Sequence, residues 1–167
     1  MSTQPETGKA PPVLKSEAQI IIATVDQLDD LTPLFDAYRV FYRQASDAEN
    51  TKKFLSERMH LRDTVIFMAY VNSRAVGFTQ LFPSFSSETL ERLWILNDLY
   101  IAPEMRGKRI GAELIQRAKQ FVVQFGAKGL ALATEHTNLS GQKLYEREGF
   151  ELDEIYRHYF WEAQRNQ

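Results

Sequence analysis

A strand–loop–helix–strand succession in the second half of the sequence constrains the fold of this chain more than any other feature. The first run, ERLWILNDLYI at 91–101, predicts a strong strand, and Pro103 ends it because proline has no amide hydrogen for a ladder. From Gly111 to Gly126, apolar residues recur every three or four positions, which predicts an amphipathic helix. The run GLALAT at 129–134 predicts a buried second strand, parallel to the first, because a helical crossover joins parallel strands.

The remaining segments predict a mixed α/β (α+β) fold. Antiparallel pairs precede the crossover, so we expect a mostly antiparallel sheet with one parallel central pair, flanked by helices, in the order β-α-α-β-β-β-α-β-α-β. The other predicted strands are 20–25, 63–71, 75–82 and 150–160, and the other predicted helices are 24–42, 51–61 and 139–148.

Length and composition predict one domain. A chain of 167 residues is too short for two ordinary domains. Residues 1–16 are polar, hold three of the six prolines and are expected to form a disordered tail, which leaves 17–167 as the single domain.

Charge and residue content exclude several classes of function. The formal net charge of −2 gives no field that would attract nucleic acid or an acidic membrane. The absence of cysteine excludes a disulfide scaffold and a cysteine nucleophile, and the scattered histidines predict no metal site. The apolar runs are too short to span a membrane and the N-terminus lacks the order of a signal peptide, so the expected location is the cytoplasm.

The loop MRGKRIGA at 105–112 comes just before the predicted helix of the crossover. Backbone amides at a helix start lack intrahelical partners, and the helix dipole favours an anion there, with phosphate as the natural ligand. The spacing fits neither the phosphate loop of nucleoside triphosphatases nor the glycine pattern of dinucleotide folds. On these grounds alone, a solvated basic loop that caps a helix is an equally good interpretation.

Further residues decide between these interpretations. LNDLYIAP at 96–103 is followed by RGKRIG at 106–111, and then by Asn138 and LYEREGF at 144–150. These motifs, in this order and at these separations, resemble the GNAT superfamily of acetyl-CoA-dependent N-acyltransferases, and the resemblance runs from about Ile20 onward.

The resemblance implies a GNAT fold that binds acetyl-CoA between two splayed central strands. The strand at 99–101 would pair with the pantetheine arm through its backbone, the loop amides would hold the pyrophosphate, and Asn138 would hold the arm on the other side. The residues assigned to the coenzyme in this way are Leu99, Tyr100, Ile101, Arg106, Gly107, Lys108, Arg109, Ile110, Gly111, Ala112, Asn138 and Tyr145.

Two residues are candidates for catalysis. An amine must lose a proton before it attacks a thioester, and Asp98 is the predicted base, although a carboxylate that only braces a loop is an equal alternative. Family members often carry a glutamate one position earlier, where this chain has Asn97. Tyr145 stands where the family commonly has its general acid, and it would mainly donate a hydrogen bond to the leaving thiolate, whereas simple packing is its other interpretation.

Arg109 departs from the family loop, which usually has glycine at that place. If the residue requires positive φ, arginine costs of order one kcal/mol. If it already belongs to the first helical turn, arginine is tolerated, and this second case is the one we predict.

The predicted function is transfer of an acetyl group to a primary amine of a small molecule, such as a polyamine or an amino acid, without a covalent enzyme intermediate. The alternatives are a non-catalytic acyl-CoA-binding module and a protein-lysine acetyltransferase.

A homodimer is predicted because the C-terminal segment YRHYFW at 156–161 would form a bulky edge strand. The predicted acceptor pocket is lined by aromatic residues of the first helix and the 81–90 loop, namely Tyr38, Phe41, Tyr42, Phe82 and Phe85.

Overall fold

The computed structural model describes residues 16–163, which form two compact units, one ending at Ala133 and the other beginning at Thr134. Residues 1–15 of the predicted tail lie outside the described residues. Ser16 is described, and its backbone amide and hydroxyl both donate to the Glu113 carboxylate. Among residues 16–163, no helix combines the length and apolar character that a membrane crossing requires.

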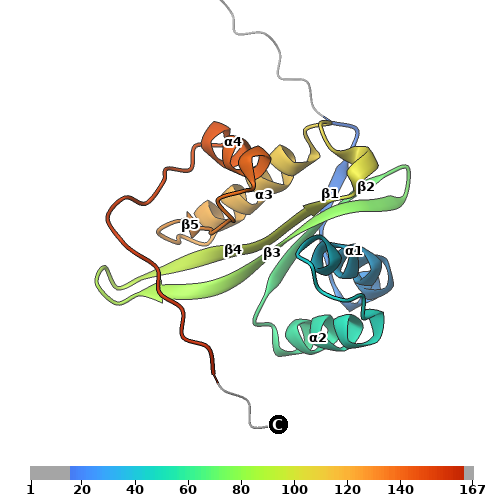
Figure 1. Cartoon of the computed structure of the whole chain (residues 1–167), viewed down its shortest axis with the longest axis horizontal. Helices are drawn as coiled ribbons and strands as arrows, with labels where there is room; N and C mark the ends of the chain where they lie inside the picture. The colour runs from blue at the N-terminus through green and yellow to red at the C-terminus, as the bar shows by residue number, and fades with distance from the viewer. Residues whose placement is uncertain (1–15, 164–167) are drawn as a thin grey trace, which may run out of the picture. The chain divides into compact units, whose positions relative to one another are not determined.

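The first unit is built on a five-stranded sheet in the order β1-β2-β3-β4-β5 (Figure 1). β1 to β4 pair antiparallel and β5 pairs parallel to β4, so the predicted mixed sheet and its parallel pair are confirmed. The strands are β1 (Gln19–Ile22), β2 (Val65–Val71), β3 (Arg74–Ser86), β4 (Glu91–Ile101) and β5 (Leu130–Ala131).

Helices cover both faces of this sheet. Figure 1 shows α1 (Leu28–Phe41) and α2 (Ala48–Leu61) on one face and α3 (Ile110–Gln124) on the other. The predicted capping box is present, because Thr24 accepts from the Asp26 amide and Gln27 accepts from the Thr24 amide; it opens a short 3-10 turn that leads into α1. The capping box explains why α1 begins close to its predicted start.

A bulge in β4 changes which face its side chains reach. Gln80 of β3 lies opposite Asp98, and its neighbour Leu81 lies opposite Leu96, so Asn97 has no partner in β3. Before this bulge, the Trp94 ring packs on Phe121 of α3, with ring centroids 5.1 Å apart. Beyond it, the buried side chains of Asp98 and Tyr100 lie on the other face of the sheet, the one that α1 covers.

The core on the α1 face is aromatic where it approaches the end of β4. Phe78 of β3 stacks on Phe35 at 5.2 Å between ring centroids, and the Tyr38 ring meets its edge at 5.9 Å. Tyr100 of β4 lies 6.4 Å from both Tyr38 and Phe78. This packing joins α1 to the part of β4 that the sequence assigns to the coenzyme.

Three predictions about elements are wrong. The 129–134 strand shortens to Leu130–Ala131 and is only partly buried, because its pairing with β4 ends after two residue pairs. The strand predicted at 150–160 is absent from the described residues, where 150–163 has no regular structure. Phe82 and Phe85 belong to β3, which continues to Ser86, and not to a loop.

The second unit contains α4 (Leu139–Arg147), close to the predicted helix at 139–148. Asn138 caps this helix, since its Oδ1 accepts from the Gly141 amide at 3.1 Å while its Nδ2 donates to the Thr134 hydroxyl at 3.0 Å. The helix is followed by Gly149, whose φ of 79° is the left-handed value that favours glycine after a helix end.

Candidate active site

The open edge of β4 is the first component of the site. β5 pairs with β4 only at Trp94 and Ile95, and beyond these residues no described strand pairs with that side of β4. The opposite side stays paired with β3 as far as Ile101, which lies opposite Gly77. Backbone groups between Leu96 and Ile101 can therefore accept an extended ligand as an added strand.

The loop after β4 is the second component. A 3-10 turn (Pro103–Met105) follows the strand, and the first α3 hydrogen bond runs from the Glu113 amide to the Arg109 carbonyl. The amides of residues 110–112 precede that bond and have no acceptor within the helix. Together with the positive end of the helix dipole, these amides suit an anion at the start of α3.

The prediction for Arg109 is wrong. Arg109 is the N-cap of α3, not a residue of its first turn, and its φ is 66°, in the left-handed region. Two residues earlier, Gly107 has a φ of 75°, so the chain turns twice through this region within three residues. A glycine is the residue that fits such a position without strain, and arginine here costs of order one kcal/mol.

Replacing Arg109 with glycine is expected to preserve turnover and to raise the free energy of unfolding by up to about 1 kcal/mol, because the left-handed strain disappears. Denaturant unfolding and steady-state kinetics measure the two effects. Gly107→Ala is the matched control in the opposite direction. A Cβ at Gly107 would meet nothing within 4 Å, so the loss of stability in Gly107→Ala comes from the positive φ alone and not from a steric clash. Complete loss of activity in Arg109→Gly would contradict this account of the loop.

The Arg106 side chain connects the loop to β4 and α1. Its Nε donates to the Ile101 carbonyl at 3.1 Å. Its guanidinium lies over the Phe41 ring at 5.5 Å and over the Tyr100 ring at 5.7 Å from the centroids. Arg106 therefore fixes where the loop leaves the strand, although it is exposed like the other two cations of the loop, Lys108 and Arg109.

Asp98 is a buried carboxylate on the α1 face, directly after the bulge. Only 5% of its surface is exposed. Burial raises the pKa of Asp98 above its ordinary value, and hydrogen bonds from the Tyr38 hydroxyl and from Asn97 Nδ2, the latter at 3.0 Å, oppose the rise in pKa. A carboxylate whose pKa is raised binds a proton more readily, so it can take a proton from a substrate and release it again.

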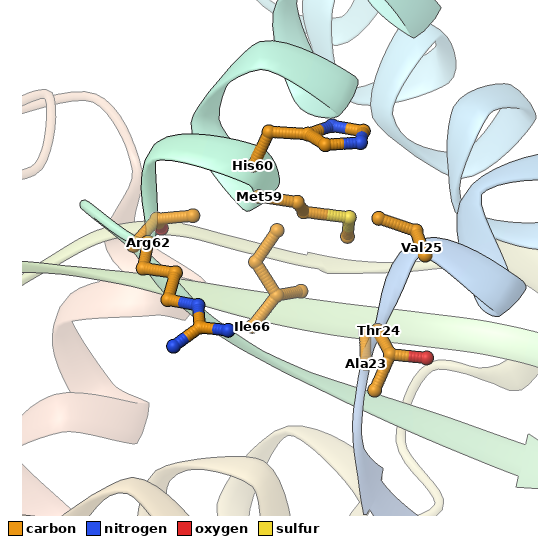
Figure 2. Close-up of a pocket in the computed structure, with 8 residues that line it drawn as sticks. Ala23, Thr24, Val25, Met59, His60, Arg62 and Ile66 are labelled. Atoms are coloured by element: carbon orange, nitrogen blue, oxygen red, sulfur yellow. The ribbon is translucent and has the colours of Figure 1, made fainter.

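Among the cavities lined by residues 16–163, two open on the side of the unit that carries α1 and α2. The larger, about 570 Å³, lies between α1 and the end of β4, and Phe41, Tyr100 and Arg106 are among its walls. The smaller, about 450 Å³, lies at the end of α2, where Figure 2 shows Met59, His60 and Arg62 facing the stretch from Ala23 to Val25. The larger volume is within the range of small-molecule sites.

Sequence reasoning missed Tyr38 as a partner of Asp98, because nothing in the spacing connects two residues so far apart in the chain. Of the aromatic residues predicted to line the acceptor pocket, Phe41 lines the larger cavity, and the use of this cavity by the acceptor stays a prediction. Within residues 16–163, no three histidine or acidic side chains cluster as a metal site.

The other two candidate residues lie in the second unit. Asn138 uses its side chain to cap α4, a role that its assignment to the coenzyme did not include. Tyr145 is in α4, and its ring meets the Phe150 ring edge-on at 6.0 Å between centroids. The Tyr145 ring thus packs on Phe150. The hydrogen bond from the Tyr145 hydroxyl to the leaving thiolate stays a prediction.

Comparisons with known proteins agree with this geometry. Residues 29–150 match the model of the acetyltransferase (GNAT) family. An uncharacterized N-acetyltransferase, YhfO of Bacillus subtilis, is 46% identical over 77% of this chain and 87% of its own length. The crystal structure of a probable acetyltransferase superposes with a TM-score of 0.84 at 39% identity, over 89% of this chain and 99% of that one.

More distant relatives carry names that specify a substrate. The D-amino-acid N-acetyltransferase HPA3 of Saccharomyces cerevisiae is 27% identical over 48% of this chain and 50% of its own length. The aminoalkylphosphonate N-acetyltransferase of Salmonella typhimurium is 29% identical over 50% of this chain and 54% of its own length.

Proposed function

The chain belongs to the GNAT family of acetyltransferases, and on that premise we propose that it transfers the acetyl group of acetyl-CoA to a primary amine of a small molecule of the polyamine or amino-acid type. The observation that carries the proposal is the open edge of β4 leading directly into a loop of free helix-start amides. An extended arm with a diphosphate at one end fits that pair of features. The two relatives named for amine substrates support the substrate class.

The acceptor is proposed to enter through the cavity of about 570 Å³ beside Tyr100. Tyr100 and Asp98 are two residues apart on β4 beyond its bulge, and both contact Tyr38 of α1. An ammonium group in this cavity would therefore approach the Asp98 carboxylate from the α1 face.

The proposed reaction begins with the proton of the substrate ammonium. Near pH 7 an amine with a pKa of about 10.4 is protonated roughly a thousandfold over its free base. Asp98 accepts one proton, directly or through a water, and the neutral amine then attacks the thioester carbon. The tetrahedral intermediate then collapses: the C–S bond breaks with its electron pair left on sulfur, and the second proton of the attacking nitrogen leaves to give the neutral amide and passes to the departing thiolate, to which Tyr145 is proposed to donate a hydrogen bond. No covalent enzyme intermediate is formed.

Coenzyme binding is tested by thermal unfolding with added coenzyme A. The expected stabilisation is about 2.7 kcal/mol at one hundred times the dissociation constant. Gly111→Pro removes one amide hydrogen in the first turn of α3, where proline is tolerated, and is expected to weaken binding about tenfold or more. Gly111→Ala keeps that amide and is the matched control. Absence of any stabilisation by coenzyme A in the wild type would refute the proposal.

We also propose a homodimer formed through the C-terminal segment. This segment is not a strand, but it exposes large side chains at Tyr156, Tyr159, Phe160 and Trp161. Four aromatic side chains bury about 600–1,000 Å² per copy, and two copies together reach the size of a stable interface. Sedimentation should show a dimer that Phe160→Asp with Trp161→Asp converts to a monomer, whereas Val123→Asp on α3 leaves it intact. A monomeric wild type would exclude this dimer.

A further inference from the structure

Gln80 is a fully buried polar side chain for which the proposed function has no role so far. It lies in β3, in the apolar run AVGFTQLF, and none of its surface is exposed. Its neighbour across the sheet is Asp98 of β4. The side chains of such a pair lie on the same face, with Cβ atoms about 4.5–5.5 Å apart.

The hydrogen bonds of Thr64 fix the orientation of the Gln80 amide. The Thr64 hydroxyl donates its single hydrogen to the Leu81 carbonyl at 2.9 Å. It can then only accept from Gln80, so the group that faces it at 2.9 Å is the Nε2 amide and not the oxygen. The side-chain oxygen Oε1 therefore points away from Thr64.

Oε1 of Gln80 has no hydrogen-bond partner among residues 16–163, although it is buried. A buried acceptor without a donor costs about 1–3 kcal/mol. The surroundings of Asp98 show where a donor can come from. Tyr38 and Asn97 both donate to the Asp98 carboxylate, and an ionised carboxylate has no hydrogen to give to Gln80. A protonated carboxyl has one.

We propose that Gln80 is a positioning residue for proton transfer, whose Oε1 accepts the O–H of Asp98 once Asp98 has taken the proton of the substrate ammonium. The inference rests on the proposed role of Asp98 as the base. In balance, the ammonium N–H bond breaks, the Asp98 O–H bond forms, and the electron pair of that N–H bond stays on the amine nitrogen. The new O–H gains an acceptor that was empty before, so the neutral acid is stabilised.

The groups around Asp98 act on its proton in opposite directions. Tyr38 from α1 and Asn97 from β4 donate to the ionised form, whereas Gln80 from β3 favours the neutral form. The cation Arg106 lies over the Tyr100 ring, further along β4. α3 packs on the opposite face of the sheet. Removal of Gln80 is therefore expected to favour the ionised carboxylate.

The direct test is the titration of the Asp98 carboxyl carbon by NMR in the full chain without substrate or coenzyme. Gln80→Met keeps the size of the side chain and removes the acceptor, and the Asp98 pKa should fall by roughly half a unit or more. Gln80→Glu places a second carboxylate opposite Asp98. The pair should then titrate in two steps, with one apparent pKa raised by more than about one unit.

Thr79→Val is the matched control. It also removes one buried hydrogen bond to residue 98, because the Thr79 hydroxyl donates to the Asp98 carbonyl at 2.9 Å, but it leaves the carboxyl group untouched. The Asp98 pKa should not change in this variant. Thermal unfolding identifies any variant that fails to fold, and Gln80→Asn, which shortens the same amide, then replaces Gln80→Met.

An Asp98 pKa that is unchanged or higher in Gln80→Met, or independent titration of the two carboxyls in Gln80→Glu, would overturn the proposal. A change in KM without a change in this pKa would instead mean that Gln80 contacts the substrate, and would also overturn it. The titration needs no turnover. It therefore separates failure of this inference from failure of the proposed base, which is measured by the activity of Asp98→Asn.

Discussion

Asp98→Asn is expected to lower kcat/KM by roughly 10²–10⁴-fold near neutral pH, the usual contribution of a positioned general base. Asparagine has nearly the same shape and can still accept the Tyr38 hydrogen bond, but it cannot take a proton. Activity with a fixed amine, measured across pH, checks this. The wild-type rate should fall as the pH drops through the raised pKa of Asp98, and this acid limb should vanish in the variant. Asp29→Asn, an exposed carboxylate paired with Lys52, is the control.

The same substitution should stabilise the protein at neutral pH. The folded-state pKa of Asp98 is raised, so the stability that belongs to its protonated form is fully present below the unfolded value of about 3.9 and is lost as the pH rises through the folded value. Asparagine mimics the protonated form at every pH. Asp98→Asn should therefore melt above the wild type at pH 8, with a difference that narrows toward pH 4. A lower melting temperature at pH 8 would show that the carboxylate braces the structure.

Phe78→Ala is expected to reduce the free energy of unfolding by about 3–5 kcal/mol, which for a chain of this size is a large part of the total. Phe78 is fully buried between α1 and the sheet and contacts the rings of Phe35, Tyr38 and Tyr100. Its loss leaves a cavity under the residues that hold Asp98 and the start of the loop. Urea unfolding with a constant m-value measures the effect.

Phe85→Ala on the same strand is the matched control. Its side chain is 66% exposed and contacts the Arg92 guanidinium at 5.2 Å, so its removal should cost no more than about 1 kcal/mol. If the two variants lost equal free energy of unfolding, the aromatic cluster around Phe78 would not be what stabilises the packing of α1 on the sheet.

Much of the fold can be predicted from local patterns. Three features each depend only on residues close together in the sequence: the capping box at Thr24, the apolar period of α3 and the strand that Pro103 ends. The structure has all three. The parallel pair follows from the crossover between its two strands. The open edge of β4 was expected from family resemblance, and its cause is that β5 pairs over only two residues.

The bulge at Asn97 could not be predicted from the sequence pattern. Trp94, Leu96, Asp98 and Tyr100 are all buried and alternate as one face of a strand would. The extra residue at 97 turns the second half of the series to the α1 face, and only the register with β3 reveals this. The contact between Tyr38 and Asp98 depends on that turn.

The errors have physical causes as well. Arg109 was placed in the helix because its neighbours continue the helical period, whereas its backbone caps the helix in the left-handed region. Residues 150–160 have the composition of a strand, but strand formation requires a pairing partner, and none of the described residues pairs with them. Gln80 gave one signal, a polar residue within an apolar run, which sequence reasoning did not use.

The most direct test of the central claim is release of free thiol from acetyl-CoA in the presence of a panel of primary amines, with the acetylated amine quantified by mass spectrometry. We expect at least one small amine to give thiol and acetylated product in equal amounts, and Asp98→Asn to reduce both by about 10²-fold or more. Tight binding of acetyl-CoA with no thiol released by any amine would contradict it, and would identify a module that binds the coenzyme without turnover.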